Sequence, residues 1–364
     1  MLFQLGELFS GPGGLAVGAL NASIANPLFR IEHAWSNDID PDTCNTYRTN
    51  ICPDNPKSVI CEDVHNLDIT KLPNINAFAF GFPCNDFSVV GEQKGFNGKY
   101  GPLYTYGVQV LKYFKPYWFL AENVSGLRSA NSGIAFKKIL KDFRSAGYRI
   151  YPHLYKFEEY GVPQTRHRII IVGIRDDQPY EFRIPSTKPY EGMDVSAKTA
   201  LENPLIAHNA YNNERPNISE RVQRRLEYIK PGMNAFNSKM PEDLKLHVKG
   251  ATLSQIYRRL RPDKPSYTVT GSGGGGTHIY HYSEARSLTN RERARLQTFP
   301  DEYCFKGTRE KVRRQIGMAV PCRGAQIIFE AILKTFAEES YDFDDFSVDE
   351  KKIVEQLNAK LCFA

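Results

Sequence analysis

A solitary cysteine after a short apolar run is the residue of this sequence best suited to nucleophilic chemistry. The block GFPCNDFS at residues 81–88 follows the run Ala77–Phe80, so Cys84 is expected at the carboxyl end of a strand, where open α/β sheets gather reactive groups. A lone cysteine is more often a small buried hydrophobe, but Pro83 restricts the backbone and directs the thiol outward. Because a thiolate is a soft nucleophile suited to an electron-poor ring carbon, we predict covalent catalysis at Cys84.

Two further clusters could support this nucleophile. Glu122 closes the apolar run Trp118–Ala121 and could donate a proton to a bound ring, although for this residue taken singly a cap of the next helix is the better interpretation. Arg166 and Arg168 open the β-branched run 169–172, and a spacing of two places them on the same side of a strand. Two aligned guanidinium groups suit an anion or a carbonyl oxygen.

The segment ELFSGPGG, residues 7–14, is typical of a turn that binds a nucleoside cofactor. Gly11 and Gly13 join an apolar run to a helix expected from Leu15, and such a turn exposes backbone N–H groups at a helix N-terminus. Asp38 follows the second apolar run, where an acid can accept hydrogen bonds from ribose hydroxyls. Asp63 follows a third run and suits an adenine amino group, with helix capping as the alternative.

These residues require a scaffold of alternating strands and helices. Apolar runs separated by helix-length segments, with Gly and Pro at the joins, predict an α/β protein with a doubly wound, mixed but mostly parallel Rossmann-like sheet. The expected strands are residues 3–9, 31–36, 77–80, 118–122 and 168–174, and the expected helices between them are 107–114 and 133–146.

After residue 175 the sequence becomes Pro-rich, polar and irregular. This change predicts a second, smaller and irregular domain. We expect a catalytic and cofactor-binding domain at 1–180, the second domain at 181–305, a helical segment at 306–337 that returns to the first domain, and an acidic tail with a solvated final helix at 338–364. Helical patterns within the later part cover residues 219–229, 289–298, 311–315 and 324–336.

Composition narrows the class of protein. A hydrophobic fraction of 41% with 24% charged residues predicts a folded chain, and a net charge of +6 would suit a polyanionic partner. Seven cysteines without a C-x-x-C pair indicate neither a zinc site nor a disulfide framework, so we expect no metal. No signal-peptide order and no apolar run of about 20 residues is found, which predicts a cytoplasmic setting and no membrane.

Taken in order, these blocks resemble those of bacterial cytosine-5 DNA methyltransferases of restriction-modification systems over almost the entire length. Each block is short, but their joint order is highly specific. The matching blocks are the turn with Phe9, Gly11 and Gly13, Pro83-Cys84, residues 122–124 (ENV), Gln164 with Arg166 and Arg168, 257–260 (YRRL) with Pro265 and Thr268, 286–289 (RSLT), 291–292, 295–297, 299–300 and 315–321 (QIGMAVP).

The resemblance implies a role for each catalytic block. Cys84 looks like the nucleophile that attacks C6 of cytosine, and Glu122 like the residue that contacts N3 and the exocyclic amine. Arg168 resembles the arginine that holds the cytosine O2, with Arg166 as support. Because the ring carbons cannot be reached in a stacked duplex, the target base must be flipped out. The methyl donor would be S-adenosyl-L-methionine.

The resemblance also implies a cofactor pocket. Phe9, Gly11 and Gly13 would contact the methionine part and Asp38 the ribose. The remaining residues of the implied pocket are Ile39 and Asp63 at the adenine, together with Pro83, Leu103 and Val320. Met318 stands where the family usually has an asparagine, and this departure puts tight cofactor binding in doubt.

The implied partner is double-stranded DNA, read by the second domain, with no obligate protein partner and a monomeric state. Candidates for contact with the DNA backbone are Arg221, Arg224, Arg225, Lys245 and Lys249, although a charge-rich helix is usually a solvated face. A transfer-RNA cytosine-5 methyltransferase of the same fold is an alternative, because it would use the same Cys84 and Glu122. A catalytically inactive DNA-binding homologue is another, should Met318 abolish cofactor binding.

Overall fold

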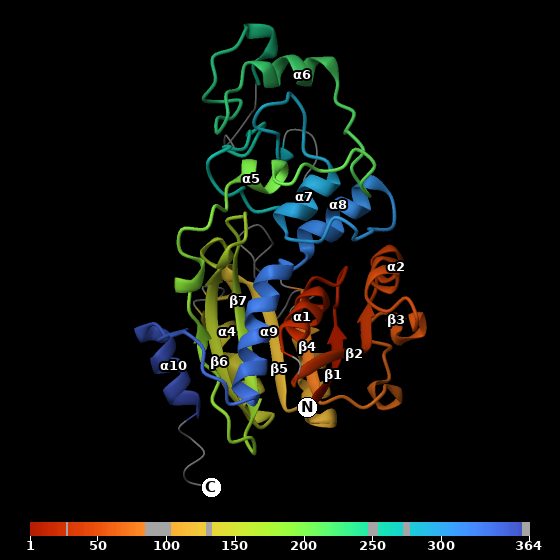
Figure 1. Ribbon diagram of the computed structural model, residues 1–364, viewed down its shortest axis with the longest axis vertical. Helices are drawn as coiled ribbons and strands as arrows, with labels where there is room; N and C mark the ends of the chain where they lie inside the picture. The colour runs from red at the N-terminus through yellow and green to blue at the C-terminus, as the bar shows by residue number, and fades with distance from the viewer. Residues whose placement is uncertain (27, 84–102, 129–132, 247–253, 272–276, 359–364) are drawn as a thin grey trace. The chain divides into compact units, whose positions relative to one another are not determined.

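The sheet that carries the predicted catalytic blocks has seven strands in the order β3-β2-β1-β4-β5-β7-β6 (Figure 1). The computed structural model describes residues 1–26, 28–83, 103–128, 133–246, 254–271 and 277–358. β3, β2, β1, β4 and β5 are parallel, and β7 runs antiparallel to β5 and β6. The strands are β1 (Leu2–Leu8), β2 (Arg30–Asp38), β3 (Val59–Cys61), β4 (Ala77–Gly81), β5 (Trp118–Val124), β6 (Tyr148–Lys156) and β7 (His167–Arg175).

Burial on both faces explains why the central strands read as continuous apolar runs. Residues 77–80 of β4 and 118–121 of β5 are all fully buried, as expected where helices cover both faces of a sheet. The mixed, mostly parallel sheet predicted from the sequence is confirmed. The elements without such a signal include β6, whose Pro152 interrupts the pattern on an edge strand, and the polar helix α2 (Pro41–Asn50).

Helices from opposite ends of the chain cover one face of the sheet. α1 (Gly14–Ala25) lies beside α9 (Cys322–Phe336), as Figure 1 shows. The contact is so close that a Cβ at Gly18 would lie 2.5 Å from the Cβ of Ala325. The other face carries α3 (Tyr104–Phe114) and α4 (Ile134–Ser145) over an aromatic core that includes Phe80 and Phe119.

The C-terminal tail is only partly solvated, because Glu338, Glu339, Asp342 and Asp345 are exposed as expected while its later part packs against the sheet. β9 (Phe343–Asp344) pairs with β8 (Ile184–Pro185), and α10 (Val348–Asn358) lies along β6 and α4. Glu350 of α10 is only 5% exposed, and its carboxylate lies 3.1 Å from the His153 ring. An acidic composition alone did not reveal this, because the partners lie about 200 residues away in the sequence.

The chain divides into two compact units. Unit 1 comprises residues 1–156, 167–191 and 322–364, and unit 2 comprises 157–166 and 192–321. Unit 2 contains α5 (Ala197–Glu202), α6 (Glu220–Glu227), α7 (Asn290–Leu296) and α8 (Arg309–Met318). One of its small cores surrounds Leu226, Leu244 and Tyr280. The long regions without helix or strand agree with the Pro-rich, polar texture of the sequence.

One segment, Arg309–Phe336, is long and apolar enough to cross a membrane by length and composition. Its apolar window is 78% buried inside the protein, and Ala319–Pro321 separates α8 from α9. Burial of this kind is typical of the core helices of a folded domain.

Candidate active site

The glycine turn after β1 is held to the end of β2 by backbone and carboxylate bonds. Gly11 and Gly13 both have positive φ, +58° and +94°, which favours glycine over residues with a Cβ. The Gly11 N–H donates to the Asp38 carboxylate at 3.0 Å, and the Ser10 N–H donates to the Asn37 carbonyl at 3.0 Å. These contacts fix the shape of the turn at the carboxyl edge of the sheet.

Asp38 has a structural role at the carboxyl edge of the sheet. Its second carboxylate oxygen accepts the Asp40 N–H at 3.0 Å. Burial raises the pKa of the Asp38 carboxyl, while the N–H groups of Asp40 and Gly11 oppose that rise. Each carboxylate oxygen keeps a further lone pair for another donor, so a role in binding a ribose hydroxyl is compatible with the structure.

Some residues near this turn are exposed or, within the described part of the chain, have a polar atom without a hydrogen-bond partner. Ile39 is 63% exposed although it is apolar, and the buried Ser10 hydroxyl has no hydrogen-bond partner among the described residues. Asp63, two residues after the end of β3, accepts from the His65 N–H at 3.0 Å. An exposed apolar side chain and an unsatisfied buried hydroxyl fit a ligand with an aromatic ring and polar groups, as S-adenosyl-L-methionine has.

The start of the predicted nucleophile block is anchored by the next strand. Asn123 of β5 donates from its side-chain amide to the Phe82 carbonyl at 3.2 Å. Pro83 is half-buried, and Cys84 lies outside the described residues. Leu103, at the other end of that gap, is 6% exposed and belongs to the core under the sheet. Asn123 was only part of a matched block in the sequence, and its anchoring role comes from the structure.

Glu122 and Arg168 form an ion pair at this edge. The β4–β5 register sets Glu122 opposite Gly81, and a Cβ at Gly81 would come within 3.1 Å of the Glu122 carboxylate. Arg168 Nε lies 2.8 Å from Glu122 Oε1, and both side chains are 13% exposed. Arg168 Nη1 donates to the His167 carbonyl at 2.8 Å. Within the described part of the chain, Nη2 of Arg168 has no partner.

Arg166 has a different environment from Arg168. It belongs to unit 2 and is 1% exposed. Its Nη1 donates to the Val269 carbonyl at 3.0 Å, and its Nη2 donates to the carbonyls of Gly317 and Ala319 at 3.1 and 2.9 Å. These bonds tie the segment before β7 to the C-terminal end of α8. The spacing of two predicts that Arg166 and Arg168 act on the same ligand, but their bonds among the described residues join the two side chains to different partners.

The block around Met318 is also shaped by close backbone packing. A Cβ at Gly317 would lie 2.0 Å from the Gly271 nitrogen, so only glycine fits between α8 and the 270–271 segment. Met318 itself is 56% exposed. Val320, the remaining residue of the expected cofactor pocket, is 6% exposed and belongs to unit 2.

The basic residues expected to contact DNA are mostly engaged. Arg225 of α6 is 4% exposed, donates to the Leu244 carbonyl at 2.7 Å and stacks on Tyr257, so it supports the core of unit 2 and is not part of a solvated face. Arg221 donates to the Asp243 carbonyl at 3.0 Å. The others stand as follows: Arg224 lies 3.6 Å from Asp243, Lys245 pairs with Glu242, and Lys249 is outside the described residues.

Solved structures share this fold across the chain. A prophage-encoded protein of Escherichia coli matches with a TM-score of 0.68 and 22% identity, covering 92% of this chain and 99% of that one. The Dnmt2 methyltransferase of S. pombe matches with a TM-score of 0.58 and 16% identity, covering 92% and 99%. The strand order and these matches thus define a Rossmann-like α/β fold.

Sequence comparison gives the family. Residues 3–334 match the C-5 cytosine-specific DNA methylase family. The Type II methyltransferase M.BbvI of Brevibacillus brevis is 56% identical, covering 98% of this chain and 99% of that protein, and M.NgoFVII of Neisseria gonorrhoeae is 40% identical, covering 96% and 91%. The chain belongs to the C-5 cytosine-specific DNA methylase family and is a DNA cytosine-5 methyltransferase, as its blocks predict.

Proposed function

We propose that this protein transfers a methyl group from S-adenosyl-L-methionine to C5 of a cytosine flipped out of duplex DNA, through a covalent bond between Cys84 and C6. The observation that carries the proposal is the Glu122–Arg168 pair at 2.8 Å. It lies beside Gly81, three residues before Cys84. An acid and an arginine at this point can hold the polar edge of a pyrimidine while a thiolate attacks the ring.

The proposed reaction begins at the thiol. The Cys84 thiolate adds to C6, and the displaced electron pair makes C5 nucleophilic. Glu122 meets N3 and the exocyclic amine and offsets the charge that develops in the ring. Arg168 holds O2, for which its Nη2 group is available while Nε and Nη1 stay bound to Glu122 and His167. C5 then takes the methyl group, with S-adenosyl-L-homocysteine as the leaving group. A base removes the C5 proton, and the electron pair of that C–H bond expels the Cys84 thiolate from C6.

The cofactor would lie along the carboxyl ends of β1 to β4. Bound there, S-adenosyl-L-methionine supplies an electrophilic methyl group. Phe9, Gly11 and Gly13 would contact its methionine part and Asp38 its ribose. The other residues of the proposed pocket are Ile39 and Asp63 at the adenine, with Pro83, Leu103 and Val320 completing it. The support is the exposed Ile39 face and the buried Ser10 hydroxyl without a partner among the described residues.

Arg166 is proposed as a positioning residue. Its three bonds to backbone carbonyls organise the 269 and 317–319 segments, and the latter segment contains Met318 and precedes Val320 of the proposed cofactor pocket. Arg166 would therefore act on catalysis through the backbone that it holds. It would make no direct contact with the substrate.

The biological setting follows from the names of the relatives. Two similar proteins are Type II methyltransferases, so we propose that this chain belongs to a restriction-modification system. Its methylation would protect DNA from a cognate endonuclease in the cytoplasm. It would act on double-stranded DNA as a monomer, with residues 181–305 supplying sequence recognition.

Replacing the nucleophile tests the covalent step. We expect Cys84→Ser to abolish transfer of a labelled methyl group to duplex DNA while calorimetry still detects cofactor binding. Cys304→Ser is the matched control, because Cys304 is a partly exposed cysteine of unit 2 and has no proposed role. Substantial turnover by Cys84→Ser would refute covalent catalysis.

Trapping the enzyme on a fluorinated base tests the elimination of the C5 proton. It also tests whether the substrate is duplex DNA. A duplex with 5-fluorocytosine at the target, first located by bisulfite sequencing after expression, should form an adduct that survives denaturant, because fluorine at C5 cannot leave as a proton does. The same assay with Cys84→Ser should give no adduct. Methyl transfer to transfer RNA without transfer to duplex DNA would contradict the proposed substrate.

A further inference from the structure

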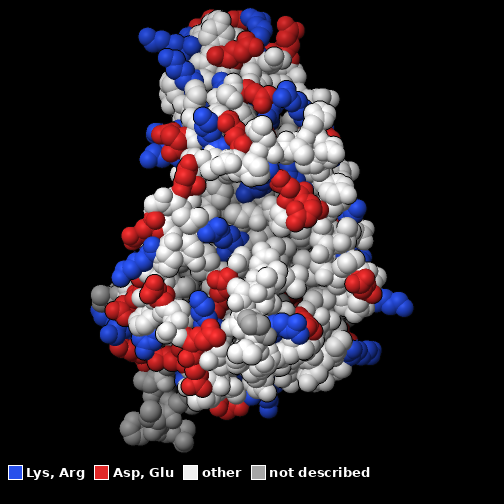
Figure 2. Space-filling view, viewed as in Figure 1, with Lys and Arg blue, Asp and Glu red and all other residues white. Residues whose placement is uncertain are grey.

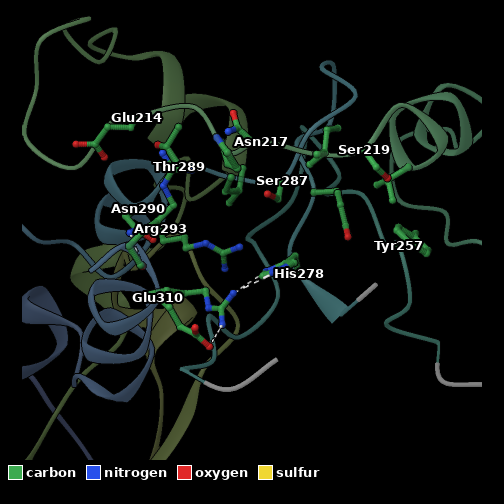
Figure 3. Close-up of a pocket in the computed structure, with 17 residues that line it drawn as sticks. Glu214, Asn217, Ser219, Tyr257, His278, Ser287, Thr289, Asn290, Arg293 and Glu310 are labelled. Carbon is green, nitrogen blue, oxygen red and sulfur yellow. Dashed lines mark hydrogen bonds and ion pairs between the residues drawn. The ribbon is translucent and has the colours of Figure 1, made fainter. Parts of the chain in front are cut away.

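A cavity in unit 2 contains a buried arginine that the proposed catalytic mechanism does not use. The cavity has a volume of about 480 Å³, and all its lining residues belong to this unit. Its walls come from the segment 214–222, from Tyr257, from residues between 278 and 293, and from the first turns of α8 (Figure 3). This volume lies within the range of sites that hold small molecules.

Arg293 extends from α7 into the cavity, with its guanidinium directed toward His278 in Figure 3. Its side chain is 3% exposed, and no residue in the described ranges forms a hydrogen bond or ion pair with the guanidinium. The adjacent Glu292 is engaged elsewhere, because its two oxygens pair with Arg286 at 2.7 and 2.8 Å. Burial and the charge of Arg313 lower the pKa of Arg293 to about 10, so it stays protonated at neutral pH.

Arg313 of α8 brings a second cation to the same cavity. Its Nη1 lies 3.2 Å from the His278 ring, and its Nη2 lies 3.5 Å from the Glu310 carboxylate. Glu310 is 84% exposed, so this ion pair is weak. Burial, with the charges of Arg293 and Arg313, lowers the pKa of His278 to about 4. His278 is therefore neutral at pH 7 and adds no charge to the cavity.

Two guanidinium groups that face one cavity favour the binding of an anion there. A buried cation without a partner costs several kcal/mol, and guanidinium forks match the oxygens of phosphate. The family acts on DNA, whose backbone is a polyphosphate, yet Figure 2 shows acidic side chains interspersed among the basic ones on the face in view. A specific phosphate pocket would bind the backbone without requiring one large basic surface.

We propose that this cavity binds a phosphate group through Arg293 and Arg313. The phosphate is supplied by the DNA backbone or by a free phosphate anion. The residues that line this cavity do not include Glu122 or Arg168.

The first arm of the test measures free anion binding. Thermal unfolding is followed in sodium phosphate and in sodium chloride of equal ionic strength, for the wild type, Arg293→Met and Arg314→Met. Arg314 is the matched control, because it is an exposed arginine of α8 that does not line the cavity. A free-anion site predicts that phosphate raises the unfolding midpoint of the wild type and of Arg314→Met more than that of Arg293→Met.

The second arm measures duplex DNA binding as a function of salt concentration. If a backbone phosphate enters the cavity, Arg293→Met should reduce the slope of log K against log[salt] by about 0.9, and more than Arg314→Met does. An unchanged slope with a lost phosphate response identifies the free anion. Should Arg293→Met fail to fold, Arg313→Met replaces it in both arms. The proposal is overturned if the cavity variant responds to phosphate and to salt as the wild type does.

Discussion

Replacing Glu7 by glutamine should stabilise the protein increasingly as the pH rises above about 5 and leave it almost unchanged near pH 4. Glu7 lies on β1, two residues before Phe9, and is fully buried. One carboxylate oxygen accepts a hydrogen bond from the Tyr47 hydroxyl, and the other has no partner among the described residues. Tyr47 also contacts His33, whose pKa burial lowers to about 4, so no cation from this cluster neutralises the carboxylate.

The magnitude follows from the shift of the Glu7 pKa. Burial raises it from 4.5 to about 7, against the opposing bond from Tyr47. A carboxyl with a raised pKa favours folding below its unfolded value, and that contribution is lost as the pH rises from about 4.5 through 7. The difference approaches about 3.5 kcal/mol at pH 8, at roughly 1.4 kcal/mol per pKa unit between 4.5 and about 7.

Urea unfolding at a series of pH values between 4 and 8 is the assay. We expect Glu7→Gln to match the wild type near pH 4 and to exceed it progressively above pH 5. Glu32→Gln, on the neighbouring strand, is the control, because Glu32 is exposed. Parallel stability curves for Glu7→Gln and the wild type across this range would refute a protonated, buried Glu7.

Three further substitutions test other parts of the structure. Gly18→Ala should lower the free energy of unfolding by about 1–3 kcal/mol, since its Cβ would overlap Ala325; an unchanged melting temperature would contradict the close helix contact. Arg166→Lys should lower the melting temperature, because lysine cannot bind its three carbonyls with a fork, and equal stability would argue against the positioning role. Met318→Asn should tighten cofactor binding by roughly three- to tenfold in calorimetry, the worth of one hydrogen bond; unchanged or weaker binding would mean that the pocket does not use this amide.

Local patterns were sufficient to predict most of unit 1. Strands β4 and β5 are buried on both faces, so their sequences are unbroken apolar runs that predict central strands. The glycine turn was recognisable because Gly11 and Gly13 adopt positive φ, which a sequence shows as glycine. The edge strand β6 was missed, because an edge strand tolerates Pro152 and partly polar faces.

The sequence by itself determined which chemistry the protein can perform, because a thiol, an acid, two arginines and a glycine turn are recognisable by residue type and spacing. Only the tertiary structure decided what each charged group faces. The β5–β7 pairing brings Glu122 and Arg168 together, Arg166 is engaged by carbonyls more than 100 residues away, and Arg293 faces a cavity. Such partners depend on strand register and on contacts between distant segments, and these arise only when the chain buries its apolar surface.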